Sequence, residues 1–254
     1  MTVDPRAASG FASAADEYER ARPSYPADAV AALARRLGVD EHSTILDLGA
    51  GTGKLTRLLV PHAGRVIAVD QSEPMLARLR RELPTVEVRA GVAEAIPLPD
   101  GSVDAVFVGQ AFHWFGTEAA CRDIARVLRP KGALGLVWNH GRWDEGENAP
   151  PWHEAFVAFI EPLRKAAGDF PAEDWKEAIA RTGLFEDLQL DHASHDQHLD
   201  SEGFVELIAS WSWIANLPDD RRAEVLADTR RLAEQTPDIA LHHDTELYST
   251  RLRA

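Results

Sequence analysis

Between residues 27 and 139, short apolar runs alternate with segments whose apolar residues recur at helical spacing. The runs are residues 44–48, 65–70, 86–90, 103–109 and 133–138. Apolar runs of this length are typical of strands that are buried on both faces, as in parallel sheets. Parallel strands need crossover connections, and the helical segments between the runs supply them. The alternation therefore predicts an α/β fold with a parallel sheet covered on both faces.

The pattern changes after Asn139. Residues 140–171 are irregular or helical and rich in Trp, His and Pro. The remaining residues predict a helix at 173–182, a sixth strand at 188–194, helices at 201–215 and 219–235, and a last strand near 246–252. We therefore expect a sheet of about seven strands, the last antiparallel, with a helical cap made from two insertions.

Composition excludes several classes of partner. The 254 residues carry a formal net charge of −14, which argues against a general nucleic-acid or anionic-membrane binder because phosphate contacts need a basic surface. Cys121 is the only cysteine, so no intrachain disulfide can form. The first residues show no signal-peptide pattern, and no apolar run approaches the roughly 20 residues of a membrane-spanning helix. These features predict a cytoplasmic protein without nucleic-acid or membrane partners, and leave its oligomeric state open.

The first predicted strand leads into a glycine-rich loop, Asp47-Leu48-Gly49-Ala50-Gly51-Thr52-Gly53. Glycines allow the backbone to turn sharply and to approach a ligand closely. The amides at the start of the following helix favour a negative or polar ligand group. Asp70 ends the next predicted strand, where a carboxylate can accept two hydrogen bonds from ribose hydroxyls. The loop and Asp70 together predict a nucleoside-binding site.

Two other glycine motifs can be tested letter by letter. A dinucleotide motif G-x-G-x-x-G that starts at Gly49 would need a glycine where Lys54 stands. A phosphate-binding P-loop fails at Leu48 and at Leu55. The observed G-x-G-x-G spacing suits a ligand without a pyrophosphate. An NAD-type oxidoreductase remains an alternative that Lys54 disfavours, and a cofactor-binding protein without catalysis is a third.

The glycine loop, Asp70 and several further segments follow one another as they do in a known family. In these segments the chain resembles the class I S-adenosylmethionine-dependent methyltransferases, specifically the small-molecule branch that includes trans-aconitate methyltransferases. The resemblance covers roughly residues 10–140, and the rest more loosely. It implies a Rossmann-like sheet, a small-molecule substrate and S-adenosylmethionine as cofactor. It rests on Tyr18…Arg22-Pro23-Ser24-Tyr25-Pro26, the loop Asp47–Gly53, Val69-Asp70-Gln71-Ser72…Met75, Ala93-Glu94-Ala95-Ile96-Pro97-Leu98-Pro99 and His113-Trp114-Phe115.

The resemblance also implies roles for single residues. Asp47 and the glycine loop would hold the methionine part of the cofactor, and Asp70 would bind the ribose. Gln71 and Met75 would flank the adenine, while Tyr18 or Arg22 would close over the carboxylate. The full set of expected cofactor-binding residues is Tyr18, Arg22, Asp47, Gly49, Ala50, Gly51, Gly53, Asp70, Gln71, Met75, Ala93, Glu94 and Gln110.

One position departs from the family's pattern. Many relatives carry an acidic residue after the third strand that reads the adenine amino group, and Val92 stands there in this chain. Either the Ala93 amide and the Glu94 side chain take over this role, or adenine is held mainly by apolar contact.

The substrate is expected beside the carboxyl ends of the fourth and fifth strands, where ligands of open α/β sheets bind. Methyl transfer from a sulfonium is a direct displacement, so the enzyme mainly aligns nucleophile, carbon and sulfur. The resemblance slightly favours a carboxylate acceptor, which has no proton to lose. The expected substrate contacts are His113, Trp114, Asn139, Arg142 and Trp143.

His113 is the candidate catalytic residue. An imidazole has an ordinary pKa near 6.5 and can act as a general base for an acceptor that must lose a proton. An aromatic-rich His-Trp-Phe turn can equally wall the pocket or orient the substrate. A carboxylate acceptor favours the second role.

Histidines also gather late in the sequence, at His192, His195, His198, His242 and His243. On a strand, His192 and His198 face away from His195, and neither a cysteine nor an H-E-x-x-H pattern accompanies them. We therefore predict no metal site.

The helix predicted at 201–215 contains Trp211 and Trp213, two positions apart, so we expect that they do not share one narrow face. Together these interpretations give an N-terminal gating segment at 1–26, a cofactor-binding Rossmann-like core at 27–139, a cap insertion at 140–172, and a return to the core with a second helical insertion at 173–254.

Overall fold

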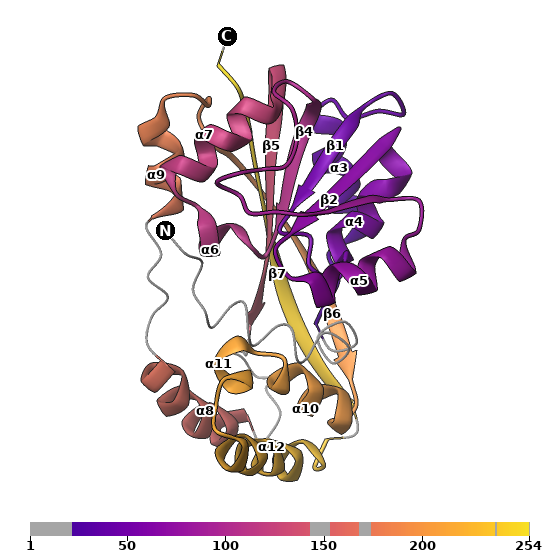
Figure 1. Ribbon diagram of the computed structural model, residues 1–254. Helices are drawn as coiled ribbons and strands as arrows, with labels where there is room; N and C mark the ends of the chain where they lie inside the picture. Colours follow the sequence, from indigo (N-terminus) through magenta and orange to yellow (C-terminus); the bar gives the residue numbers. More distant parts are fainter. Residues whose placement is uncertain (1–21, 143–152, 168–173, 237, 254) are drawn as a thin grey trace. The chain divides into compact units, whose positions relative to one another are not determined.

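The computed structural model describes residues 22–142, 153–167, 174–236 and 238–253 (Figure 1). Its strands are β1 (Thr44–Leu48), β2 (Arg65–Asp70), β3 (Glu87–Ala90), β4 (Val103–Gly109), β5 (Leu128–Arg142), β6 (Gln189–Leu199) and β7 (Ile239–Arg251). Its helices are α3 (Ala27–Arg36), α4 (Lys54–Leu59), α5 (Glu73–Glu82), α6 (Phe112–Phe115), α7 (Glu118–Val127), α8 (His153–Ala167), α9 (Trp175–Thr182), α10 (Ser201–Ala209), α11 (Ser212–Ala215) and α12 (Asp219–Ala233), with a 3-10 turn at Val60–His62. No helix in these ranges is long and apolar enough to cross a membrane.

The strands form one seven-stranded sheet in the order β3-β2-β1-β4-β5-β7-β6. The pairs β3-β2, β2-β1, β1-β4 and β4-β5 are parallel. Strand β7 runs antiparallel to β5, because the Leu252 N–H donates to the Gly132 carbonyl while the Thr245 hydroxyl donates to Asn139 at the other end of the pair. The predicted sheet of about seven strands is confirmed. Its strand order reverses between β1 and β4, which is where open α/β sheets bind ligands.

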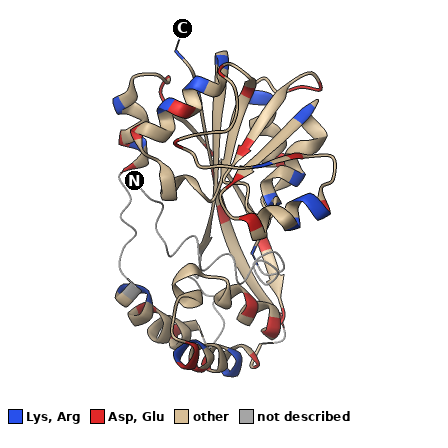
Figure 2. Ribbon diagram, viewed as in Figure 1, with Lys and Arg blue, Asp and Glu red and all other residues tan. Residues whose placement is uncertain are grey.

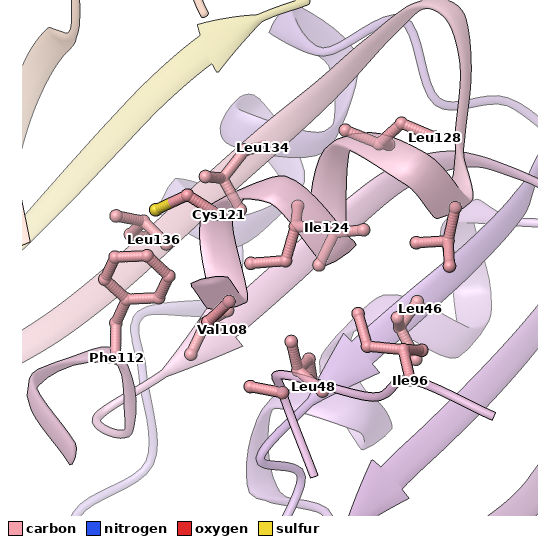
Figure 3. Packing of buried hydrophobic residues seen from close by; sticks show 14 of the residues in the cluster. Leu46, Leu48, Ile96, Val108, Phe112, Cys121, Ile124, Leu128, Leu134 and Leu136 are labelled. Atoms are coloured by element: carbon pink, nitrogen blue, oxygen red, sulfur yellow. The ribbon is translucent and has the colours of Figure 1, made fainter. Parts of the chain in front are cut away.

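Alternate residues of the central strands enter two apolar clusters. Leu46 and Leu48 of β1 pack in one cluster, and Ile45, which precedes them on the same strand, packs in the other. Figure 3 shows the first cluster, in which Cys121 and Ile124 of α7 lie beside side chains of β4 and β5. Cys121 is a free thiol that is fully buried there. This burial on both faces explains the apolar runs in the sequence.

The chain divides into two compact units. The first, here called the α/β unit, comprises residues 24–139, 172–193 and 245–254, and the second, the helical unit, comprises 1–23, 140–171 and 194–244. The described part of the helical unit has its own apolar core, in which the rings of Phe156 and Phe204 lie 5.2 Å apart. The two predicted insertions thus share one core.

Charged residues of both signs are dispersed over the elements of both units (Figure 2). On α12, for example, Arg221 pairs with Glu224, and Arg231 pairs with Asp228. The excess of acidic residues is therefore interspersed with local ion pairs.

Several expectations about local structure are wrong. Strand β5 begins at Leu128 rather than at 133, and Lys131 takes a left-handed φ of 66° where the pairing with β4 shifts register. The helix expected at 201–215 is broken at Ser210, so α10 and α11 are separate. The rings of Trp211 and Trp213, which we expected not to share one narrow face, consequently pack against each other with their centroids 5.2 Å apart.

The helix N-termini differ in how they are capped. The Thr117 hydroxyl accepts a hydrogen bond from the Ala120 N–H at the start of α7. Ser72 occupies the N-cap position of α5, but its hydroxyl makes no capping bond and is buried without a hydrogen-bond partner. Only the first of these two hydroxyls stabilises its helix.

This difference predicts unequal effects of the same truncation. T117A should lower the free energy of unfolding by about 1 kcal/mol, whereas S72A should change it by less than about 0.5 kcal/mol. T117S keeps the capping oxygen and should behave like the parent. Chemical denaturation measures all three, and equal losses for T117A and S72A would contradict this account.

Candidate cofactor and substrate site

The glycine loop takes a backbone course that side chains would obstruct. Gly49 and Gly53 have φ values of 72° and 91°. A Cβ on Gly49 would lie 2.8 Å from the Ala111 Cβ, and a Cβ on Gly53 would lie 2.9 Å from the Leu79 Cγ. Both positions therefore require glycine for conformation and for space.

Asp70 is hydrogen-bonded to the glycine loop. Its Oδ2 accepts from the Gly51 N–H and its Oδ1 from the Ser72 N–H, each at 2.8 Å. Burial raises the pKa of Asp70, and these amide hydrogen bonds oppose the rise. Each carboxylate oxygen can accept further hydrogen bonds, so the group can still bind hydroxyls.

Asp47 is fully buried at the end of β1. The Thr56 hydroxyl donates to its Oδ2, while its Oδ1 is buried without a hydrogen-bond partner. Burial raises the pKa of Asp47 to about 7, and the charge of Asp70 adds to the rise. An unpartnered carboxylate oxygen two positions before the first loop glycine fits the ammonium group of a methionine moiety. The residues present thus fit the implied cofactor.

The expected adenine-flanking residues lie beside this loop. The Met75 Sδ would lie 3.5 Å from a Cβ on Gly51, and Gln71 is exposed. The Gly91 N–H donates to the Asp70 carbonyl at 3.0 Å, which places the segment after β3 next to Asp70. In that segment Ala93 is buried, Glu94 is half-buried and Val92 is 38% exposed. Both expected ways of holding the adenine, by the Ala93 amide and the Glu94 side chain or by apolar contact, therefore stay predictions.

The sequence did not single out the residues that hold the segment after β3. Asp123 accepts the Ile96 N–H at 2.6 Å, and Arg126 donates to the carbonyls of Ile96 and Leu98. Both side chains come from α7, where they also pair with each other at 2.7 Å. From the sequence alone, Asp123 and Arg126 cannot be distinguished from an ordinary ion pair on a helix surface.

The expected substrate residues of the α/β unit lie on α6 and in the last part of β5, and Gln110, an expected cofactor-binding residue, follows β4 beside them. Gln110 has a left-handed φ of 51°, and its Nε2 donates to the Asn139 carbonyl at 2.7 Å. On α6, the His113 Nδ1 accepts from the Trp138 indole N–H at 3.4 Å, and the rings of His113 and Trp114 lie 5.0 Å apart. The structure thus brings Gln110, His113 and Asn139 to neighbouring strand ends.

Trp138 is held by further aromatic rings that the sequence did not single out. It stacks on Trp175 at 4.8 Å and meets the edge of Tyr248 at 5.7 Å. Its position at the carboxyl end of the predicted fifth strand was the available signal. Tyr25 is also buried, and its hydroxyl would lie 2.6 Å from a Cβ on Gly109.

The remaining expected site residues are not brought to this place by the described structure. Arg22 belongs to the helical unit, where it donates to the Ser210 hydroxyl and carbonyl at 2.9 and 3.1 Å. Arg142 ends β5, and its side chain lies outside the described residues, as do Tyr18 and Trp143. Their proposed roles stay predictions.

The histidines of β6 and β7 lie in the helical unit, except His192. As expected, His192 and His198 are exposed and His195 faces the other way, where it stacks on His243 at 5.1 Å. Burial lowers the pKa of His243 to about 4, and the neighbouring His195 and His242 add to this effect. Among the described residues, no three potential ligand side chains form a group that could hold a metal ion.

Comparison with known proteins agrees with this geometry. Residues 46–136 match the family model of a methyltransferase domain. An uncharacterized methyltransferase-like protein of Schizosaccharomyces pombe is 39% identical over 88% of this chain and 85% of its own length. A malonyl-[acyl-carrier protein] O-methyltransferase of Methylococcus capsulatus is 40% identical over 43% of this chain and 46% of its own length. A structure from Anaeromyxobacter dehalogenans, assigned as a type II methyltransferase, has a TM-score of 0.63 and 25% identity, over 91% of this chain and 97% of that one.

The sheet order, the glycine loop and the carboxylate after β2 define a Rossmann-like methyltransferase architecture. With its close relatives, this chain belongs to the class I S-adenosylmethionine-dependent methyltransferases. The family decides against the NAD-type oxidoreductase and against a protein without catalysis.

The raised pKa of Asp47 predicts a pH-dependent stability. Between pH 3.8, the ordinary value, and about 7, the folded protein holds a proton that the unfolded chain has lost. The contribution of Asp47 therefore makes the free energy of unfolding fall as the pH rises through this range, by about 4 kcal/mol in all.

D47N keeps this side chain uncharged, so its stability relative to the parent should increase from pH 4 to pH 7. Asp70 acts in the same direction, but the difference between variant and parent isolates Asp47. Denaturation of cofactor-free protein at a series of pH values gives the slope. D187N, at a side chain that is 96% exposed, serves as the control. A difference that does not change with pH would show that Asp47 is ionised throughout.

Proposed function

We propose that this chain transfers the methyl group of S-adenosylmethionine to an anionic oxygen of a small molecule, with a carboxylate as the best-supported acceptor. The observation that carries the acceptor class is the hydrogen bond from the Trp138 indole to the His113 ring. The cofactor part rests on the glycine loop and Asp70.

In this proposal the α/β unit holds the cofactor from several sides. Asp70 accepts hydrogen bonds from the ribose hydroxyls, and the loop from Gly49 to Gly53 holds the methionine part beside Asp47. Met75 and the segment at Ala93 contact the adenine through apolar surface. The cofactor supplies an electrophilic methyl group on a sulfonium. The protein's task is to bind it, exclude water and align the acceptor.

The tautomer of His113 supports an anionic acceptor. An indole N–H can only donate, so this hydrogen bond assigns the Nδ1 of His113 as the accepting nitrogen, and a neutral ring would carry its proton on Nε2. Trp175 and Tyr248 hold the Trp138 ring in place. A neutral imidazole in this tautomer presents an N–H donor, which suits an acceptor oxygen with negative charge. A carboxylate is already ionised at neutral pH and needs no base.

Two further observations agree with this acceptor class. The relative from Methylococcus capsulatus carries a name that places the methyl group on oxygen, and the resemblance to trans-aconitate methyltransferases points the same way. The formal net charge of −14 disfavours nucleic acid as the substrate. We therefore favour an acidic acceptor over nucleic acid.

The cofactor part of the proposal is tested at Asp70. D70N removes the charge from the ribose hydrogen bonds and should weaken S-adenosylhomocysteine binding roughly 10–150-fold, which corresponds to about 1.5–3 kcal/mol. D104N is the matched control, since Asp104 also accepts a backbone N–H, from Thr44 at 2.8 Å. Calorimetric titration gives both affinities. A folded D70N that binds as tightly as the parent would remove Asp70 from the site.

The role of His113 is tested by its pH dependence. If His113 orients the acceptor through its N–H, the turnover of the parent should stay level from about pH 6 to about pH 8. H113Q keeps a donor and should retain more than about a tenth of the turnover, whereas H113A should lose more. Labelled methyl donor and a panel of carboxylates, phenols and amines provide the assay. A titration that is present in the parent and absent in H113Q, with a loss of roughly 10²–10⁴-fold, would instead establish a general base.

A further inference from the structure

One side chain, that of Asn139, links three points at which the chain passes between the two units. The chain passes between the two units after residues 23, 139 and 244, among other places. Ser24, Asn139 and Thr245 are the residues of the α/β unit at these three points. All three are linked through Asn139 by hydrogen bonds.

The Asn139 amide uses both of its ends. Its Nδ2 donates to the Ser24 carbonyl at 2.9 Å, and its Oδ1 accepts from the Thr245 hydroxyl at 2.7 Å. Its backbone carbonyl accepts from the Gln110 Nε2 at 2.7 Å. Asn139 is 9% exposed and Thr245 is fully buried, so water does not readily replace these partners.

An amide is the group that this position requires. The Ser24 carbonyl can only accept, so it needs a donor, and the Thr245 hydroxyl needs an acceptor. A carboxylate would turn an oxygen toward the Ser24 carbonyl, and an apolar side chain would leave both partners unsatisfied. The two ends of the amide are therefore assigned by their partners.

Gln110 connects Asn139 to the loop that carries His113. Gln110 has a φ of 51°, which is uncommon for a residue with a side chain. Two hydrogen bonds hold it there, from its N–H to the Val137 carbonyl and from its Nε2 to the Asn139 carbonyl. Helix α6, with His113, begins two positions later.

We propose that Asn139 is a positioning residue, which fixes Ser24, Thr245 and Gln110 and thereby the loop of His113, and that it does not contact the substrate. Its amide is already bonded to protein groups, so the substrate contact expected from its place after the predicted fifth strand is replaced by a different role. The consequence for catalysis rests on the proposed methyl transfer, whereas the consequence for local mobility does not.

The sharpest variant is N139D, which exchanges one NH2 for an oxygen and leaves shape unchanged. At neutral pH it should keep S-adenosylhomocysteine affinity within about threefold of the parent and lower kcat by about tenfold or more, because alignment is lost. Amide exchange of residues 24–30 and 110–115 should become about tenfold faster, while β1 and β2 stay unchanged.

A protonated carboxyl has one donor and one acceptor, like the amide. The ratio of exchange rates between N139D and the parent should therefore return toward one as the pH is lowered. A merely structural defect would not be repaired in this way. T245V removes the other hydrogen bond without changing shape and should give a smaller effect on the same segments.

T250V is the matched control, since Thr250 is a buried residue of the same strand whose hydroxyl donates to the Glu186 carbonyl at 2.8 Å. It should leave both segments and kcat unchanged. If N139D does not fold, T245V against T250V decides the question by exchange alone. Parental exchange in N139D and T245V, or an N139D defect that does not depend on pH, would overturn the proposal. Failure of the parent to bind the methyl donor would overturn the proposed function and leave the exchange test valid.

Discussion

The site depends on the Asp70 carboxylate and the two backbone amides that it accepts. The N–H groups of Gly51 and Ser72 come from the loops after β1 and β2, and each bonds one oxygen of the same carboxylate. The Asp70 carbonyl also accepts the Gly91 N–H, from the loop after β3. One residue therefore fixes three consecutive loops at the carboxyl edge of the sheet. Burial disfavours its charge and raises its pKa, and the amides oppose that rise while leaving acceptor capacity for hydroxyls.

Asp47 lies at the same edge of the sheet, but its carboxylate does not have a partner on each oxygen. One of its oxygens is bonded to Thr56 and the other is buried without a partner, so its pKa rises to about 7. Burial raises the pKa of both neighbouring acids, and the hydrogen bonds that oppose the rise come from different partners. Asp70, which has an amide partner on each oxygen, suits a permanent hydrogen-bond acceptor. Asp47 suits a group whose negative charge is stabilised only when a cation is bound beside it.

Much of the fold could be predicted because burial on both faces leaves a direct mark on the sequence. Strands β1, β2 and β4 begin and end where their apolar runs do. Strand β5 starts five residues earlier than its run (128 against 133), because Lys131 adopts a left-handed conformation that a sequence pattern does not reveal. The break between α10 and α11 was missed for a similar reason, since Ser210 ends the first helix through local hydrogen bonds.

The sequence predicts the positions of the candidate site residues but not their hydrogen bonds. The loop glycines and Asp70 could be found because their spacing is local. The partners that decide the roles of His113 and Asn139 are remote, with Trp138 at 25 positions from His113, and Ser24 and Thr245 at 115 and 106 positions from Asn139. Only the folded sheet brings such residues together, so their tautomers and hydrogen-bond assignments lie beyond a sequence argument.

The central claim is methyl transfer to a carboxylate oxygen, and the chemical stability of the product tests it most directly. Incubation with methyl-labelled S-adenosylmethionine and a mixture of small metabolites should yield a labelled methyl ester, from which mild alkali releases labelled methanol. Label in an alkali-stable bond to nitrogen, carbon or an ether oxygen would contradict the assigned acceptor. It would also contradict the role of His113 as a neutral donor.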